Sequence, residues 1–205
     1  MININHFKIT NGARTYYGGD QGWWGDSRFF FGLQKKETAG CAAIAATNLA
    51  KYLARDDERF AALFPAGDTK EEYMQIADRV WDVVSPSVAG MWWKSAFARA
   101  FTKYAKQNGG ELTSTLYGAR DTAGAAAFIC SALDAGIPPV IGIHLNRALR
   151  SRGQCFERHW VVITDVTDGD RPKINVLSWA EQYELDLRCA VMESTYYGLV
   201  RFDKR

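Results

Sequence analysis

Four side chains in this sequence are of types that can together cleave an amide bond: Gln34, Cys41, His159 and Ser178. A cysteine thiol becomes a strong nucleophile when a histidine accepts its proton, because the imidazolium then stabilises the thiolate. The residues of such sites lie far apart along a chain and meet only in the fold. We therefore expect Cys41 to be a nucleophile and His159 to be its base.

Cys41 stands where a loop becomes a helix, in the stretch "LQKKETAGCAAIAATNLAKYL". A helix N-terminus carries unpaired N–H groups and a partial positive charge, which favour a thiolate over a thiol. This placement predicts a depressed pKa for the Cys41 thiol and alkylation at a pH where a free cysteine reacts slowly. The alternative is a cysteine that is buried for packing only.

His159 opens the apolar run "HWVVI", so a buried strand is expected to hold its backbone while its ring faces a cleft. A third group should accept a hydrogen bond from the far ring nitrogen and fix the ring. The next strand, "INVLSW", runs back past His159 if the two strands form a hairpin. Ser178 is the first candidate for this third group, Asn175 is its rival, and Asp165 is a further possibility.

Gln34 lies in the loop before the cysteine, and its amide NH2 could join the backbone N–H of Cys41 in holding an oxyanion. Three other residues compete for the two central roles. Cys155 is a rival nucleophile, although it precedes a strand rather than a helix, and His6 and His144 are the other histidines.

The segments that must position these residues form two halves. Residues 1–32, rich in glycine and aromatic side chains, indicate a short strand and then irregular loop. Residues 33–110 contain three helical stretches, one opened by a capping-box pattern at Thr69 and Glu72, and residues 111–205 are rich in short β runs. We expect a single α+β domain over 1–205, with a helical half that carries the nucleophile packed against an antiparallel β-sheet that carries His159, and the active-site cleft between them.

Composition narrows the classes of function. The chain has 205 residues with 25 Lys and Arg against 23 Asp and Glu and no basic stripe, which disfavours nucleic-acid partners. The apolar run "IPPVIGIHL" is too short to span a bilayer, and the start has no signal-peptide pattern. Four scattered cysteines without a CxxC pair are typical of a reducing compartment. We expect a cytoplasmic protein with no metal site, no cofactor and no membrane partner, while secretion by a route without a signal stays open.

The order of Gln34, Cys41 at the head of a helix, His159 at the head of an apolar strand and then "LSW" resembles the papain-like cysteine peptidase superfamily. "CAAIAATNLAKYL" and "HWVVITDV" are most similar to its compact bacterial branch, the double-glycine leader peptidases that process bacteriocins. The resemblance implies a papain-like fold, thiol-dependent hydrolysis and a peptide or protein substrate. It also implies that Trp179 shields the histidine and that Gly40 contributes to substrate binding.

Two positions depart from the family pattern. Ala42 replaces the glycine that usually follows the cysteine, and Leu177 stands where papain-type enzymes have the asparagine that orients the histidine. The second departure leaves a catalytically inactive papain-like binding module as one alternative. Acyl transfer, including that of an effector that modifies host proteins, would use the same residues and is the other.

Overall fold

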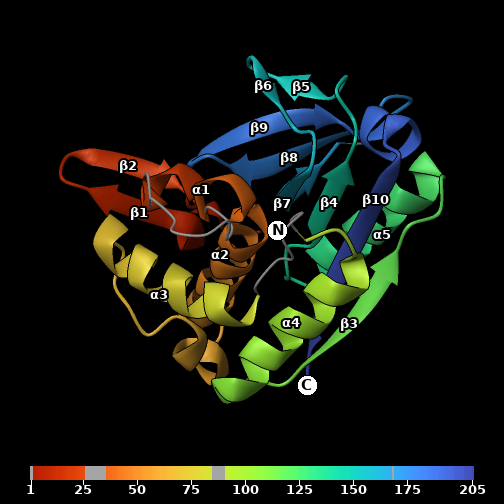
Figure 1. The fold of residues 1–205 in the computed structure, drawn as a ribbon. Helices are drawn as coiled ribbons and strands as arrows, with labels where there is room; N and C mark the ends of the chain where they lie inside the picture. Colours follow the sequence, from red (N-terminus) through yellow and green to blue (C-terminus); the bar gives the residue numbers. More distant parts are fainter. Residues whose placement is uncertain (1, 26–35, 85–90, 168) are drawn as a thin grey trace, which may run out of the picture.

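The computed structural model describes residues 2–25, 36–84, 91–167 and 169–205. Figure 1 shows the helices of the first half beside a twisted sheet that the second half builds. The elements follow one another as η1 (Ile4–Phe7), β1 (Lys8–Asn11), β2 (Arg14–Tyr17), η2 (Gln21–Trp24), α1 (Lys36–Ala39), α2 (Cys41–Asp56), η3 (Glu58–Leu63), α3 (Lys70–Val83), α4 (Lys94–Gln107), β3 (Leu112–Tyr117), α5 (Thr122–Asp134), β4 (Val140–His144), β5 (Arg150–Ser151), β6 (Gln154–Cys155), β7 (His159–Val166), β8 (Lys173–Ser178), β9 (Glu181–Asp186), η4 (Cys189–Glu193) and β10 (Tyr196–Lys204). The predicted α+β architecture is confirmed.

The large sheet has six strands in the order β3–β10–β4–β7–β8–β9, and all neighbouring strands are antiparallel. β7 and β8 form the predicted hairpin, with Val162 opposite Leu177. The first residue of β7, His159, lies opposite Ile143 of β4. β4 therefore holds the backbone of the predicted base, and β8 pairs with β7 from Val162 onward.

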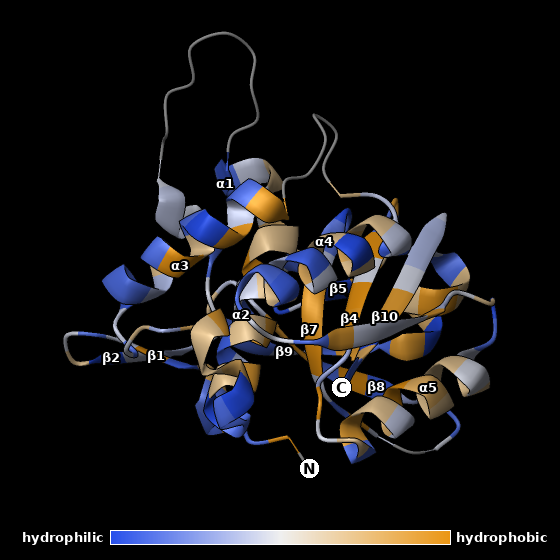
Figure 2. Ribbon diagram, turned by 90° about the horizontal axis from the view of Figure 1, so that it is seen from below, coloured by the Kyte–Doolittle hydropathy of each residue, from blue (hydrophilic) through white to orange (hydrophobic). Residues whose placement is uncertain are grey.

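Both faces of this sheet are covered by apolar contacts. Val162 points into a core shared with α2, α3 and α4, while its neighbour Ile163 points into a second core shared with α5. Figure 2 shows the apolar residues of β4 and β7 in the middle of the molecule. Because successive side chains of a strand face opposite sides, a strand that is buried on both faces is apolar without alternation. This explains the run "HWVVI".

The helix α2 carries Cys41 and lies inside the molecule. Every residue from Cys41 to Leu53 is buried, and the helix packs against β7. Alanine is the strongest helix former, and its small side chain lets a helix approach a sheet closely. The alanine-rich start of α2 therefore explains how the nucleophile comes to the head of β7.

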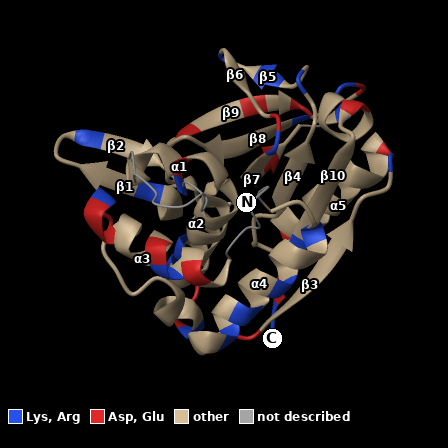
Figure 3. Cartoon of the chain, in the orientation of Figure 1, with Lys and Arg blue, Asp and Glu red and all other residues tan. Residues whose placement is uncertain are grey.

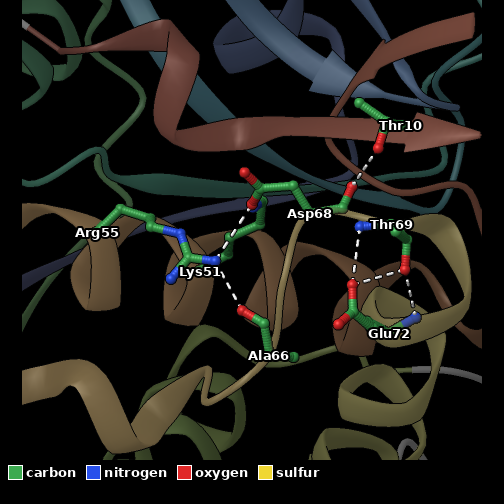
Figure 4. A network of polar contacts seen from close by, with 7 residues as sticks. All are labelled: Thr10, Lys51, Arg55, Ala66, Asp68, Thr69 and Glu72. Atoms are coloured by element: carbon green, nitrogen blue, oxygen red, sulfur yellow. Dashed lines mark hydrogen bonds and ion pairs between the residues drawn. The ribbon is translucent and has the colours of Figure 1, made fainter.

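Lys51 of α2 is a charged residue that is only 1% exposed, and it forms an ion pair with Asp68 (Figure 4). Nη2 of Arg55 donates to the carbonyl of Ala66 at 2.6 Å and lies 3.2 Å from a carboxylate oxygen of Asp68. The backbone carbonyl of Asp68 accepts the N–H of Thr10 at 2.6 Å. This network joins α2, the loop before α3 and the first hairpin.

The start of α3 has the predicted capping box. Thr69 Oγ1 accepts the N–H of Glu72 at 3.3 Å, and the Glu72 carboxylate accepts the N–H of Thr69 at 3.2 Å (Figure 4). Both side chains thus satisfy N–H groups that a helix start leaves unpaired.

The N-terminal segment differs from the expectation of one strand followed by loop. β1 and β2 form a hairpin, with Lys8 opposite Tyr17, and residues 18–24, which we call the strap, continue from it. The side chain of Asp20 caps η2 within the strap by accepting the N–H of Gly22 at 2.8 Å. Sequence periodicity misses this segment because its strands are four residues long and its path depends on glycine.

Charges of both signs are mixed on the view in Figure 3, for example along α3, and the chain carries a formal net charge of +2. Across the residues that the structure describes, no helix is long and apolar enough to cross a membrane.

Candidate active site

Cys41 is the first residue of α2 and is 7% exposed. Gly40 precedes it as the N-cap residue and has no side chain that could cap the helix. A Cβ on Gly40 would lie 2.4 Å from the ring of Trp24, so the glycine allows the strap to pack against the start of α2. The structure thus puts the thiol at a helix N-terminus, with the strap beside it.

The ring of His159 is held by two neighbours. Its Nε2 lies 2.5 Å from Oγ of Ser178, and the ring of Trp179 stacks on it with centroids 4.4 Å apart and an interplanar angle of 11°. His159 itself is 7% exposed. The contact with Ser178 leaves Nδ1 as the ring nitrogen that can accept a proton.

The turn between β8 and β9 places both of these neighbours. Ser178 pairs with Glu181, and the two residues between them, Trp179 and Ala180, have φ values of 45° and 63°. A two-residue turn with both φ angles positive usually contains Asn and Gly, since other residues are strained there by roughly 1–3 kcal/mol each. Arg158, directly before His159, also has a positive φ of 54°. Strained backbone therefore lies next to the predicted base at two places, just before β7 and just after β8.

Cys41, His159 and Ser178 line one cavity, whose volume is about 10 Å³. A cavity of this size holds about one water molecule. Gly19 and Gln21 of the strap also line it. The thiol makes a long contact of 3.9 Å with the carbonyl oxygen of Arg158, and within the described residues no hydrogen bond joins it to the His159 ring.

Burial is the largest cause of the pKa shifts of Cys41 and His159. It raises the pKa of the Cys41 thiol, and the backbone N–H groups of Trp160, Ala42 and Cys41 offset only part of that rise. Burial also lowers the pKa of His159 to about 3. The expected depressed pKa of the thiol is therefore wrong for this conformation, because the loss of hydration outweighs the helix N-terminus. The resting pair is a neutral thiol beside a neutral imidazole.

The remaining predicted site residues have different positions. Gln34 falls outside the described residues. Asn175 lies three residues before Ser178 on β8, and its Nδ2 donates to Asp165 at 3.5 Å. Asn175 and Asp165 line another, larger cavity together with Gln182, away from the thiol.

The rival residues lie apart from this cavity. Cys155 belongs to β6, and its Sγ contacts the carbonyl of Arg147 at 3.8 Å. His6 interacts with Asn3, their side-chain nitrogens being 2.9 Å apart. His144 ends β4 and is buried. The cavity that holds Cys41 and His159 includes none of the three.

Sequence reasoning missed the residues that hold the strap over the cavity. Asn48 Oδ1 accepts the N–H of Gly19 at 2.9 Å and the hydroxyl of Tyr73 at 2.8 Å. The N–H of Ala180, in the strained turn, donates to the carbonyl of Gly19 at 3.1 Å. The glycine pair in "YYGGDQG" and a polar Asn48 within an apolar helix were the available signals.

No protein-family model matches the sequence, and no curated protein is significantly similar to it. Among solved structures, the fold is similar to the crystal structure of UfSP from C. elegans, with a TM-score of 0.51 over 97% of this chain and 11% identity. That neighbour has a papain-like fold, so the likeness shows the same fold here. The match covers 34% of the UfSP chain.

Proposed function

We propose that this protein is a thiol-dependent peptidase or amide hydrolase in which Cys41 is the nucleophile and His159 is the base. The carrying observation is that both side chains line one cavity, while Ser178 and Trp179 fix the imidazole. The fold neighbour is a cysteine protease, which supports the same class of reaction.

The reaction begins with transfer of the thiol proton from Cys41 to Nδ1 of His159. The thiolate then attacks the acyl carbon, and Nδ1 returns the proton to the leaving amine as the carbon–nitrogen bond breaks. Water, deprotonated by Nδ1, next attacks the thioester and releases the acid and the thiol. Ser178 keeps its hydrogen bond to Nε2 throughout and so fixes the ring.

The resting pair is neutral, so the proton of Cys41 moves to His159 only when a substrate enters the site. The cavity of about 10 Å³ cannot hold a peptide, so residues that line it must shift and widen it when a substrate binds. The backbone N–H of Cys41 and the side chain of Gln34 remain our predicted oxyanion donors.

The finer assignments are also proposals. The likeness of the segments around Cys41 and His159 to double-glycine leader peptidases supports a peptide or protein substrate. A bacterial source, a cytoplasmic location, the absence of nucleic-acid partners and a single domain over 1–205 remain predictions. Acyl transfer would use the same steps, with an amine in place of water.

A mixture of synthetic peptides of varied sequence, analysed by mass spectrometry after incubation with the protein, tests the proposal. We expect cleavage that Cys41→Ala abolishes and that His159→Ala lowers by about 10²–10⁴-fold. Cys155→Ala is the matched control and should leave the rate unchanged. Cleavage that survives Cys41→Ala but not Cys155→Ala would show that Cys155, and not Cys41, is the nucleophile.

The enclosed cavity and the raised pKa of Cys41 favour a second candidate, a catalytically inactive papain-like binding module. This candidate predicts that neither the peptide mixture nor acyl acceptors are turned over, although the native fold is intact.

A further inference from the structure

We infer that Gln21 recognises the substrate of the proposed peptidase, because its side-chain oxygen is positioned to accept a hydrogen bond from an N–H group next to the scissile acyl carbon. This inference rests on the proposed function and assigns a residue that the mechanism above does not use. Gln21 lines the cavity of Cys41 and His159, and its Oε1 is buried without a hydrogen-bond partner.

The orientation of the Gln21 amide follows from its other contact. Nε2 donates to the carbonyl oxygen of Glu37 at 2.6 Å. The reversed amide would place two acceptor oxygens at that distance, which is unfavourable. The side chain therefore presents its acceptor, Oε1, on the side away from Glu37. An acceptor there would repel an oxyanion, so Gln21 does not replace Gln34 in the predicted oxyanion hole.

The backbone that carries Gln21 is held in place. Gly19, two residues earlier, is fixed by Asn48 and Ala180, and Asp20 caps the turn that contains Gln21. The indole N–H of Trp24, at the end of the strap, donates to Asp78 at 2.9 Å. These contacts hold the strap on α2, α3 and the β8–β9 turn, so its polar side chain has a defined position beside the thiol.

A buried acceptor without a partner costs about 1–3 kcal/mol, and a group that supplies the missing donor recovers part of it. Peptide substrates carry a backbone N–H on each residue that flanks the scissile carbonyl, and esters and N-alkylated amides lack one. The inferred contact therefore selects secondary or primary amides over tertiary amides. The strap would both cover the empty site and contact the substrate when the site is occupied.

Two alkylating reagents test this inference without knowledge of the substrate. Iodoacetamide carries amide N–H groups one carbonyl carbon away from its reactive methylene, whereas N,N-dimethyl-iodoacetamide has none. The rate at Cys41 is measured for both reagents by peptide mapping of the full chain, and Cys130, Cys155 and Cys189 report the intrinsic reactivity of each reagent.

We expect Gln21→Met to lower the preference of Cys41 for iodoacetamide over the dimethyl reagent by about 2–10-fold, the range of one net hydrogen bond. Loss of the Glu37 contact in this variant changes access for both reagents together, so their ratio isolates the acceptor. Gln154→Met in the exposed β5–β6 hairpin is the matched control and should keep the wild-type ratio.

An unchanged ratio in Gln21→Met would overturn the inference, even if peptide cleavage by the wild type supports the proposed function. Failure of Cys41 to react with either reagent would overturn it as well, because the acceptor would then be closed to acyl compounds. A changed ratio together with absence of peptide cleavage would support the contact and contradict the peptidase.

Discussion

The Cys41 thiol and the His159 imidazole line the same cavity, and both groups are neutral in the resting protein. Removal from water opposes both the thiolate and the imidazolium, and it raises the pKa of Cys41 while lowering that of His159. The helix N-terminus and the nearby N–H groups act in the opposite direction and are weaker here.

The neutral pair predicts the pH dependence of Cys41 alkylation. Because the thiol pKa is raised, the rate of reaction with iodoacetamide should rise with pH to a midpoint above that of free cysteine, about 8.5. Ser178→Asp should lower this midpoint, since a carboxylate at Nε2 stabilises the imidazolium and thus the thiolate.

Peptide mapping after timed alkylation over a pH series measures both midpoints. Ser151→Asp on β5 is the matched control, and its midpoint should equal that of the wild type. A wild-type rate that stays flat and high below neutral pH would show a preformed ion pair and contradict the neutral state.

A second residue-scale prediction concerns His144. Burial lowers its pKa to about 4, and the charge of Arg158 adds to the effect, whereas the unfolded value is about 6.5. Above the unfolded pKa both states are neutral. As the pH falls from there toward the folded pKa, the unfolded state binds the proton first, so the free energy of unfolding decreases.

Urea denaturation at several pH values between these two pKa values measures this loss. We expect His144→Leu to reduce the slope of the free energy of unfolding against pH by about 1.4 kcal/mol per unit. Both ring nitrogens of His144 lack a hydrogen-bond partner, so the substitution should cost little at neutral pH. An identical slope in the variant would mean that His144 is protonated in the folded state.

At the scale of elements, two tethers hold the pieces that carry the site. One is the Lys51–Asp68 pair between α2 and the loop before α3, and the other is the close contact of the strap with α2 and α3. For each tether, we expect two substitutions in the same region to change the stability of the protein by different amounts.

Breaking the ion pair from its two sides should have unequal consequences. Lys51 is 1% exposed and its side chain depends on Asp68, so Asp68→Asn should destabilise the protein by about 1–3 kcal/mol. Lys51→Met removes the buried charge, while Asp68 is half exposed and keeps Arg55, so its cost should be smaller. Chemical denaturation of both variants measures the difference, and a greater loss in Lys51→Met would contradict this account.

Gly19 and Gly22 both belong to the strap but differ in the space around them. A Cβ on Gly19 would lie 2.4 Å from the Tyr73 ring, whereas a Cβ on Gly22 would meet only Asp20 at 3.3 Å. Gly19→Ala should therefore cost about 1–3 kcal/mol of stability and displace the strap. Its Cys41 should then react faster with iodoacetamide at fixed pH, while Gly22→Ala should resemble the wild type. Equal rates in the two variants would show that the strap does not limit access.

At the scale of the whole molecule, the sequence predicts what depends on local signals. Apolar periodicity predicts the α+β architecture, the β7–β8 hairpin and the helix that starts at Cys41, and the Thr69–Glu72 pattern predicts a helix cap. The hydroxyl of Ser178 and its place at the end of the strand also favour it over Asn175 as the third group, and the structure places Ser178 at Nε2 of His159.

The features that sequence reasoning missed depend on contacts between distant segments. A Trp-Ala pair carries no local signal for a tight turn, yet both residues have positive φ. Trp179 packs against His159, and the N–H of Ala180 donates to Gly19. The strap depends on Asn48 and Tyr73, which are far from it in the sequence. The sign of the thiol pKa shift depends on burial, which is a property of the assembled fold.

The position of β10 has a consequence for biosynthesis. A ribosome makes residues 196–204 after every other strand of the large sheet, yet they lie between β3 and β4. Until they emerge, β3 has no partner and the core under α2 and α4 lacks Val200 and Phe202. We expect the residues around Cys41 and His159 in a nascent copy to reach their final packing only after translation has passed this strand.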